Sequence, residues 1–389
     1  MTTDPRAAAR AAVTAGRERV LDLSHRLHAH PEVGFEEERA CAWVGEQLAE
    51  AGFEVEAGIA DLPTALRATV GSGPLVIAVC AEYDALPGVG HACGHNVIAA
   101  AAVSAALALA PLADDLGITL HLLGTPAEEG GGGKILMLER GAFDGVHAAL
   151  MVHPTPHEHA DPPTLAVAHL DVTWTGREAH ASAYPEDGIN AADAATVAQV
   201  AVGLLRQHLR ADDRLHGIVT HGGDAPNIVP GRVEASFYAR SSTLARLAEL
   251  EPRLRDCFTA GALATGCSVQ VTAGSPPYSE AAYDAELVAV WAAAARELGR
   301  ESPTEVTAQD RRSAGSTDMA NISLAVPSIQ PFLAIDSGGV GNHHPDFAAA
   351  CATPSADAAV LDGGLGMAWT AIEAATRPRL RDRLLAART

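Results

Sequence analysis

Aromatic and basic residues are scarce in this chain of 389 residues. Aromatic residues make up 4% of the sequence, and 48 acidic residues outnumber 27 basic ones, which gives a formal net charge of −21. Nucleic acids and anionic membranes bind to basic surfaces, so this balance argues against both as partners. Alanine and glycine are abundant instead, and this composition favours a helix-rich α/β protein.

Long apolar runs and closely spaced cysteines are also missing. No stretch reaches the roughly 18 uninterrupted apolar residues of a membrane span, and Met1–Arg6 lacks the apolar core of a signal peptide. We therefore expect a cytoplasmic protein. Six cysteines are widely scattered, which argues against a disulfide framework or a zinc knuckle. We expect all of them except Cys93 to be buried hydrophobic residues.

Ligand-type side chains follow the first strongly apolar segment. The segment 74–80 is short, β-branched and continuously apolar, which predicts an interior strand. The alanine-rich segment 96–110 predicts a helix with Asn96 as its N-cap. Cys93 and His95 lie in the connection, where α/β sheets bind ligands, and in an extended segment both can face one metal ion. A buried structural cysteine beside a loop histidine is the alternative for this pair alone.

Two adjacent carboxylates follow the next predicted strand, 117–125. Neighbouring residues of an extended chain point in opposite directions. One of Glu128 and Glu129 can therefore bind a metal ion while the other acts as a general base. A solvated surface pair is the alternative.

Two more segments bring imidazoles to the same kind of position. The apolar segment 148–152 predicts a strand that ends at His153, and the polar loop 341–346 offers His343 and His344. Four donor segments that follow strands or occupy loops predict a metal centre.

The order of predicted elements indicates two domains. Residues 1–164 and 278–389 predict a mostly parallel sheet flanked by helices, and 165–277 predict an inserted ferredoxin-like domain with the order β-α-β-β-α-β. Within the larger domain we expect helices at 7–30, 36–52, 282–298 and 356–375, and a strand at 328–332.

The motifs Ala81–Asn96 and Gly315–Met319 resemble those of peptidase family M20, in its amidohydrolase branch. The group of aminobenzoyl-glutamate hydrolases and β-alanyl-lysine dipeptidases is the most similar, and the resemblance extends from Leu27 to Pro345. It implies that Glu128 is the general base and that Asp84 orients a ligand. The metal ligands that it implies are Cys93, His95, Glu129, His153 and His343. His343 is preferred to His344 because the family pattern is a histidine, one further residue and then proline.

The resemblance also assigns residues of the inserted domain. His180, in the segment 176–191, is similar to a histidine that enters the active site of the partner subunit, which implies at least a homodimer. Asn227 and Arg240 resemble residues that hold the carbonyl region and the free carboxylate of the substrate. The alternatives are a capping or surface role for His180 and a surface ion pair for Arg240. Glu82 and Asn96 stand where many members have aspartate.

The expected activity is hydrolysis of the amide bond of an N-acyl- or aminoacyl-amino acid, such as aminobenzoyl-glutamate, with a free carboxylate on the substrate. The expected cofactors are two divalent ions, zinc or manganese, with cobalt and nickel also suited to this ligand set. Three alternatives stay open: a dipeptidase for β-alanyl or other unusual dipeptides, a metal-bearing homologue without catalysis, and a metal-free module that binds a small molecule.

Overall fold

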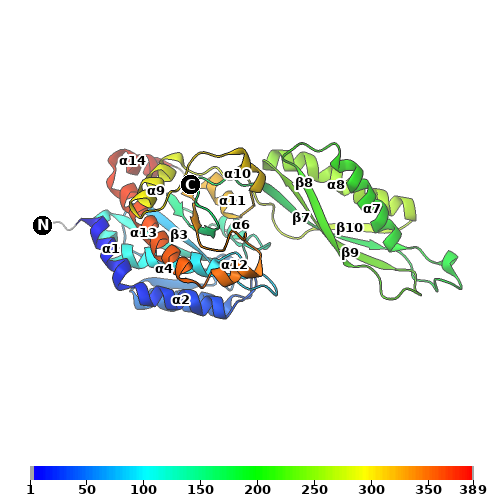
Figure 1. The fold of residues 1–389 in the computed structure, drawn as a ribbon, viewed down its shortest axis with the longest axis horizontal. Coiled ribbons are helices and arrows are strands. Elements are labelled where there is room, and N and C mark those ends of the chain that lie inside the picture. The colour runs from blue at the N-terminus through cyan, green and yellow to red at the C-terminus, as the bar shows by residue number, and fades with distance from the viewer. Residues whose placement is uncertain (1–3, 388–389) are drawn as a thin grey trace. The chain divides into compact units, whose positions relative to one another are not determined.

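The computed structural model describes residues 4–387, and the chain divides into two compact units (Figure 1). The first unit contains the chain up to Pro163, Ala281–Ser313, and the chain from Asp318 onward. The second unit contains Thr164–Glu280 and Ala314–Thr317. The start of Met1–Arg6, where no signal peptide is expected, lies outside the described residues.

The first unit is built on a mainly parallel sheet. In the described chain its strand order is β1-β2-β4-β3-β5-β11, with β4, β3, β5 and β11 parallel and β1 and β2 antiparallel at one edge. Strands β6 and β12 form a separate, short parallel pair. The predicted strand 328–332 is thus two short strands, β11 and β12. The strands are β1 (Glu54–Ala57), β2 (Leu66–Val70), β3 (Leu75–Glu82), β4 (Ile118–Thr125), β5 (Ala148–Leu150), β6 (His153–Thr155), β11 (Ser328–Ile329) and β12 (Phe332–Ala334).

Helices cover both faces of this sheet because its strands are apolar on both sides. Successive β3 residues alternate between two cores: Ile77 and Val79 belong to the core that contains α4 and α13, while Ala78 and Cys80 belong to the core that contains α6 and α11. The helix predicted at 7–30 is two helices, because the chain is interrupted at Gly16. The helices are α1 (Pro5–Ala15), α2 (Arg17–Ala29), α3 (Glu38–Glu50), η1 (Ile59–Asp61), α4 (His95–Leu109), η2 (Ala110–Leu112), α5 (Ala113–Leu116), α6 (Gly133–Glu139), α9 (Ala285–Glu297), α10 (Ala308–Ser313), α11 (Met319–Ala325), α12 (Pro345–Ala350), α13 (Pro354–Thr376) and α14 (Pro378–Ala386).

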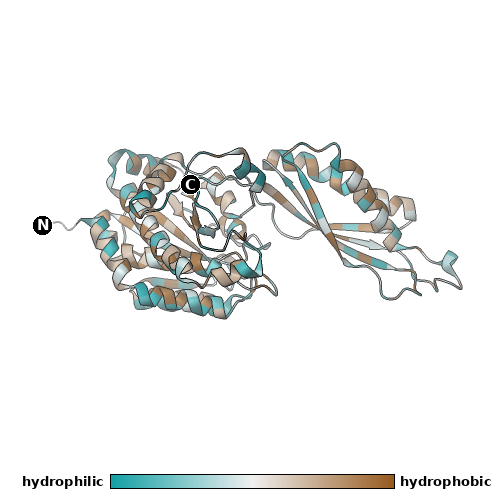
Figure 2. Cartoon of the chain, in the orientation of Figure 1, coloured by the Kyte–Doolittle hydropathy of each residue, from teal (hydrophilic) through white to brown (hydrophobic). Residues whose placement is uncertain are grey.

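Helix α4 is the central helix of the first unit. The segment His95–Leu116, with a mean hydropathy of 1.9, has the length and composition of a membrane span, although no uninterrupted apolar run was expected. Of its most apolar 18-residue window, 78% is buried inside the structure, so packing against β3 and α13 accounts for its composition. By contrast, the surface helix α2 shows both teal and brown segments in Figure 2, as a helix with one buried face does. The predicted N-cap was wrong: Gly94 precedes α4, and Asn96 donates to Ser24 Oγ and to the carbonyl oxygen of Cys351.

The second unit has the predicted element order β-α-β-β-α-β. Its sheet is antiparallel in the order β10-β7-β9-β8, which is the ferredoxin-like arrangement. The two helices pack mainly on each other and on this sheet. The mixed α/β fold with an additional antiparallel sheet is therefore confirmed. The elements are β7 (Ala166–Thr175), η3 (Pro185–Asp187), α7 (Ala191–Arg206), β8 (Arg214–His221), β9 (Arg232–Ser241), α8 (Leu244–Thr265) and β10 (Ser268–Ala273).

Candidate metal centre

The first pair of predicted donors lies where the chain passes from β3 to α4. Cys93 is in the turn before the helix and His95 is its first residue, so the pair does not form the extended segment that we expected. Gly94 between them has a φ of 82°, and a Cβ there would lie 2.4 Å from Cγ of Pro154. Glycine therefore allows this turn to approach the segment that carries His153.

A first cluster contains Cys93, His95 and His153, all of them buried. The Sγ of Cys93 is 3.4 Å from Nε2 of His153. Each imidazole is oriented through its other nitrogen: Nδ1 of His95 bonds to Asp84 at 2.9 Å, and Nδ1 of His153 bonds to the carbonyl oxygen of Pro154 at 3.0 Å. Histidines that bind metal ions are usually oriented in this way, so the arrangement fits a cation.

A second cluster contains Cys93, Glu129 and His343. Glu129 follows β4, and its Oε1 is 3.3 Å from Nε2 of His343. The backbone N–H of Glu129 donates to Oδ2 of Asp84 at 2.9 Å, so Asp84 orients one residue of each cluster. Because Cys93 belongs to both clusters, its thiolate would be a donor available to an ion in either one.

The loop that carries His343 is held against the first cluster. The N–H of His343 donates to the carbonyl oxygen of Ala92 at 2.8 Å, and Asn342 donates to the carbonyl oxygens of Cys93 and Pro154. His344 instead caps α12, because its Nδ1 accepts from the N–H of Asp346 at 3.1 Å. Of the two neighbouring histidines, it is His343 that lies with the other donors.

The ionisation of these groups reflects a crowded, buried cluster. Burial and the carboxylate of Glu129 raise the pKa of the Cys93 thiol well above its usual range. Burial opposes the charging of His95, but Asp84 and Cys93 together outweigh it and raise the pKa of His95. A divalent cation would reverse the first effect, since a coordinated thiol is deprotonated. The donor set therefore fits a metal ion.

Glu128 also lies near Nε2 of His95. Its Oε2 is 3.7 Å from His95 Nε2, and Glu82, His95 and Glu128 form a third group of close donor atoms. Burial, Glu82 and Glu129 raise the pKa of Glu128 well above its usual value. Glu128 and Glu129 thus belong to different groups of donor atoms, and they lie in a turn rather than in the extended segment that we expected.

Sequence reasoning missed the partners of Glu82. Lys134 of α6 donates to Glu82 and to Asp318, and all three side chains are fully buried. A signal was present in the sequence, because Lys134 is the only lysine among the 27 basic residues. It also missed Asn342, which has no comparable signal.

The other three predicted residues belong to the second unit. His180 is exposed, and its Nδ1 accepts from the N–H of Ala183 at 3.2 Å. The exposed Asn227 lies beside it, since residues 180 and 228 form a β-bridge. Arg240 of β9 donates to Nε2 of His216 at 3.2 Å and to Oγ of Ser316 at 2.6 Å.

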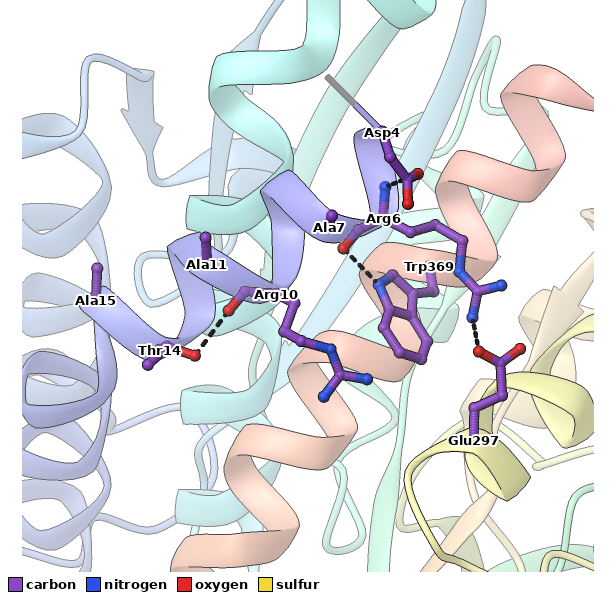
Figure 3. A pocket seen from close by; sticks show the side chains of 9 residues that line it. All are labelled: Asp4, Arg6, Ala7, Arg10, Ala11, Thr14, Ala15, Glu297 and Trp369. Carbon is purple, nitrogen blue, oxygen red and sulfur yellow. Dashed lines mark hydrogen bonds and ion pairs between the residues drawn. The ribbon is translucent and has the colours of Figure 1, made fainter. Parts of the chain in front are cut away.

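Two surface cavities of the first unit do not contain the predicted ligands. In one, of about 680 Å³, Arg6 and Arg10 stack on Trp369 (Figure 3). The other, of about 620 Å³, is lined by His28 and His91 and by mostly apolar residues.

Five of the six cysteines are buried, whereas Cys267 is half-buried, contrary to expectation.

A thiol, imidazoles and carboxylates that meet beyond the carboxyl ends of a mainly parallel sheet define a metal-dependent hydrolase. The chain belongs to peptidase family M20/M25/M40, which residues 78–360 match. It is a metal-dependent amidohydrolase of this family.

Similar proteins are found along nearly the whole chain. A Xaa-Arg dipeptidase from Mus musculus is 36% identical, over 93% of this chain and 87% of its own. One of the subunits of p-aminobenzoyl-glutamate hydrolase from Escherichia coli is 32% identical, over 67% of this chain and 58% of its own. The fold is shared with a dinuclear metal-binding peptidase of family M20 from Bacillus subtilis, with a TM-score of 0.66 and 21% identity, over 92% of this chain and 98% of the other.

Proposed function

We propose that this amidohydrolase cleaves the amide bond between an acyl or aminoacyl group and an amine that carries a free carboxylate. The observation that carries the proposal is a single buried thiol, Cys93, shared by two donor clusters beside the buried Glu128. The proposed ligands of the two ions are Cys93, His95, Glu129, His153 and His343.

Two divalent ions, when bound, polarise the substrate carbonyl and lower the pKa of an attacking water molecule. Thiolate, imidazole and carboxylate together suit zinc, and we propose zinc or manganese, with cobalt or nickel as substitutes. Asp84 supports this assignment because it fixes the ring of His95 and the backbone of Glu129 at once.

Glu128 is the proposed general base. It would take a proton from the water molecule and return it to the leaving amine. Its raised pKa suits this task, because a group that accepts and returns a proton works best when its pKa lies near the working pH.

The second unit would supply substrate contacts. We assign the carboxylate of the substrate to Arg240, whose planar guanidinium can donate two parallel hydrogen bonds. His216 and Ser316 support this assignment because they hold the guanidinium in place. His180 would stabilise the oxyanion and Asn227 the carbonyl region.

A dipeptidase is the second candidate. It is supported by the 36% identity over 93% of this chain to a Xaa-Arg dipeptidase. The net charge of −21 would attract a cationic dipeptide.

A substrate panel tests both candidates. N-acyl amino acids, aminobenzoyl-glutamate, β-alanyl-lysine and dipeptides with C-terminal arginine are assayed with added zinc or manganese, and metal content is measured in parallel. Hydrolysis of the first two classes supports the acyl-amidase, and hydrolysis of the dipeptides alone supports the dipeptidase. Protein that binds no metal after purification without chelator would contradict both and favour a metal-free binding module.

We also propose that the protein forms a homodimer through the second unit. Strand β8 is at the edge of its sheet and exposes Ile218 (67%) and Val219 (41%). Helix α7 exposes Val200 (59%) and Leu204 (66%), four residues apart on one helix face. An exposed edge strand and an apolar helix face favour association with a second copy. His180 would then act in the partner's site.

A further inference from the structure

Lys134 is a fully enclosed charge of the first unit. Its side chain has no exposed surface, and its ammonium group donates to Glu82 and, at 2.8 Å, to Oδ1 of Asp318. The backbone N–H of Lys134 donates to Oδ2 of Asp318 at 2.9 Å. Both oxygens of Asp318 therefore accept from one residue. All the other basic residues of the sequence are arginine. A lysine at this enclosed position therefore indicates that an arginine would not replace it there.

The two oxygens of Glu82 have different surroundings. Oε1 accepts from Lys134, whereas Oε2 is buried and has no hydrogen-bond partner within the described residues. Oε2 is 3.4 Å from Nε2 of His95, the nitrogen that the Asp84 contact leaves toward the metal cluster. That nitrogen also has no hydrogen-bond partner in residues 4–387. A buried carboxylate oxygen and a buried imidazole nitrogen thus lie 3.4 Å apart without a hydrogen bond between them.

This separation fits a shared cation. Two donor atoms that each lie about 2.1 Å from one ion, at a tetrahedral angle, are about 3.4 Å apart. The charge balance also favours a cation. In the buried group of Glu82, Lys134 and Asp318, two carboxylates share one ammonium group, so one negative charge is left over. An uncompensated buried charge is strongly unfavourable, and a divalent ion at Oε2 would compensate it.

We propose that Glu82 is a sixth protein ligand, and that its Oε2 binds the same divalent ion as His95. Lys134 is a positioning residue that holds the other oxygen of Glu82, and Asp318 holds Lys134. The inference rests on the proposed function, which places an ion at His95, and the donor atoms of Glu82 form one close group with those of His95 and Glu128.

The test compares two neutral substitutions around the same lysine. Glu82→Gln removes the proposed ligand charge, and Asp318→Asn removes an equal charge whose oxygens both face Lys134. Zinc and cobalt affinities of chelator-treated protein are measured by competition with a chromophoric chelator, and the visible spectrum of the cobalt form reports the coordination number of the ion. We expect Glu82→Gln to weaken one of two binding events by roughly 100-fold and to change the spectrum, and Asp318→Asn to weaken it by less than about 10-fold.

Equal affinities for Glu82→Gln and the wild type, or equal losses in both variants, would overturn the proposal. If Glu82→Gln does not fold, as judged by circular dichroism, Glu82→Asp decides instead, because it keeps the charge beside Lys134 and withdraws the carboxylate by one methylene group. A metal affinity of Glu82→Asp at least about 10-fold lower than that of the wild type supports the proposal, and a metal affinity equal to that of the wild type contradicts it. Wild-type protein without any metal binding would refute the proposed function itself, and binding without turnover would refute only the substrate assignment.

Discussion

The two units use ionisable and apolar side chains in opposite ways. The first unit encloses charge: Glu82, Lys134 and Asp318 are fully buried beside the buried donors Cys93 and His95. The second unit exposes apolar groups on α7 and β8, and its predicted functional residues His180 and Asn227 are at the surface.

The difference follows from how each sheet is covered. The sheet of the first unit is apolar on both faces and packs against helices on both, so residues beyond its strand ends are enclosed. In the second unit β8 has an exposed burial pattern along most of its length. A dry environment strengthens the electrostatic effects on which amide hydrolysis depends, whereas an open face is suited to contacts with other molecules.

The largest effect is expected at the general base of the enclosed site. Glu128→Gln should retain both ions and reduce kcat by roughly 100- to 10,000-fold, because the amide cannot take a proton. The measurements are steady-state hydrolysis and elemental analysis on the same preparation. Glu139→Gln at the exposed end of α6 is the matched control, with expected wild-type activity. A Glu128→Gln variant that turns over at the wild-type rate would refute the assignment.

The next effect concerns the stability of the first unit. Lys134→Met leaves the carboxylates of Glu82 and Asp318 without their ammonium partner, and loss of one partner from a buried ionic group costs about 3 to 5 kcal/mol of unfolding free energy. Urea unfolding of chelator-treated protein measures this loss. Added zinc should recover part of it in the variant, because the cation would compensate one carboxylate. A loss below about 1 kcal/mol would show that the buried group carries little stability.

Sequence patterns were sufficient for the architecture of both units. Period-two and period-3.6 apolar patterns located the central strands and long helices, because these elements are buried along whole faces. Boundaries were less accurate: the strand predicted at 328–332 is two short strands, and the helix predicted at 7–30 breaks at Gly16. Short segments contain too few residues for a period to be detected.

The site residues that lie within the family motifs could be predicted from the sequence. Motif resemblance brought together Cys93, His95, Glu129, His153 and His343, and the two donor clusters contain these same residues. Local pattern reasoning was wrong on the N-cap of α4, since Asn96 is used in tertiary hydrogen bonds. The contact between Lys134 and Asp318 spans 184 residues, so local patterns contain no information on it.

The exposed face of the second unit is tested by assembly. Ile218→Asp on β8 should convert a dimer into a monomer of about 40.0 kDa in sedimentation analysis, with little change in thermal stability, because the side chain is 67% exposed within the chain. Leu324→Asp on α11 of the first unit, at a residue that is 49% exposed, is the control and should leave the assembly unchanged. A wild-type protein that is monomeric and fully active would contradict both the dimer and the role of His180 across subunits.

The smallest effect is a pH dependence that arises from buried charge in the first unit. The carboxylate of Glu37 accepts from the N–H of Ala127 at 2.8 Å and from Oγ1 of Thr64 at 2.7 Å, and it has no exposed surface. Burial outweighs these hydrogen bonds and raises the pKa of Glu37 from 4.5 to about 7. The folded state therefore holds this proton more tightly than the unfolded state does. The contribution of Glu37 to stability is complete below the unfolded pKa and is lost as the pH rises through the folded pKa.

Glu37→Gln should remove this dependence, because the amide does not ionise, while its oxygen can accept from the N–H of Ala127 and its NH2 group can donate to Oγ1 of Thr64. Unfolding free energies of chelator-treated protein at pH 5 and pH 8 should differ more in the wild type than in the variant, by on the order of 1 to 3 kcal/mol. Glu36→Gln, at the exposed neighbouring residue, should leave the wild-type difference unchanged. If Glu37→Gln and the wild type lose equal stability between these pH values, the enclosure of charge in the first unit is not what makes its stability depend on pH.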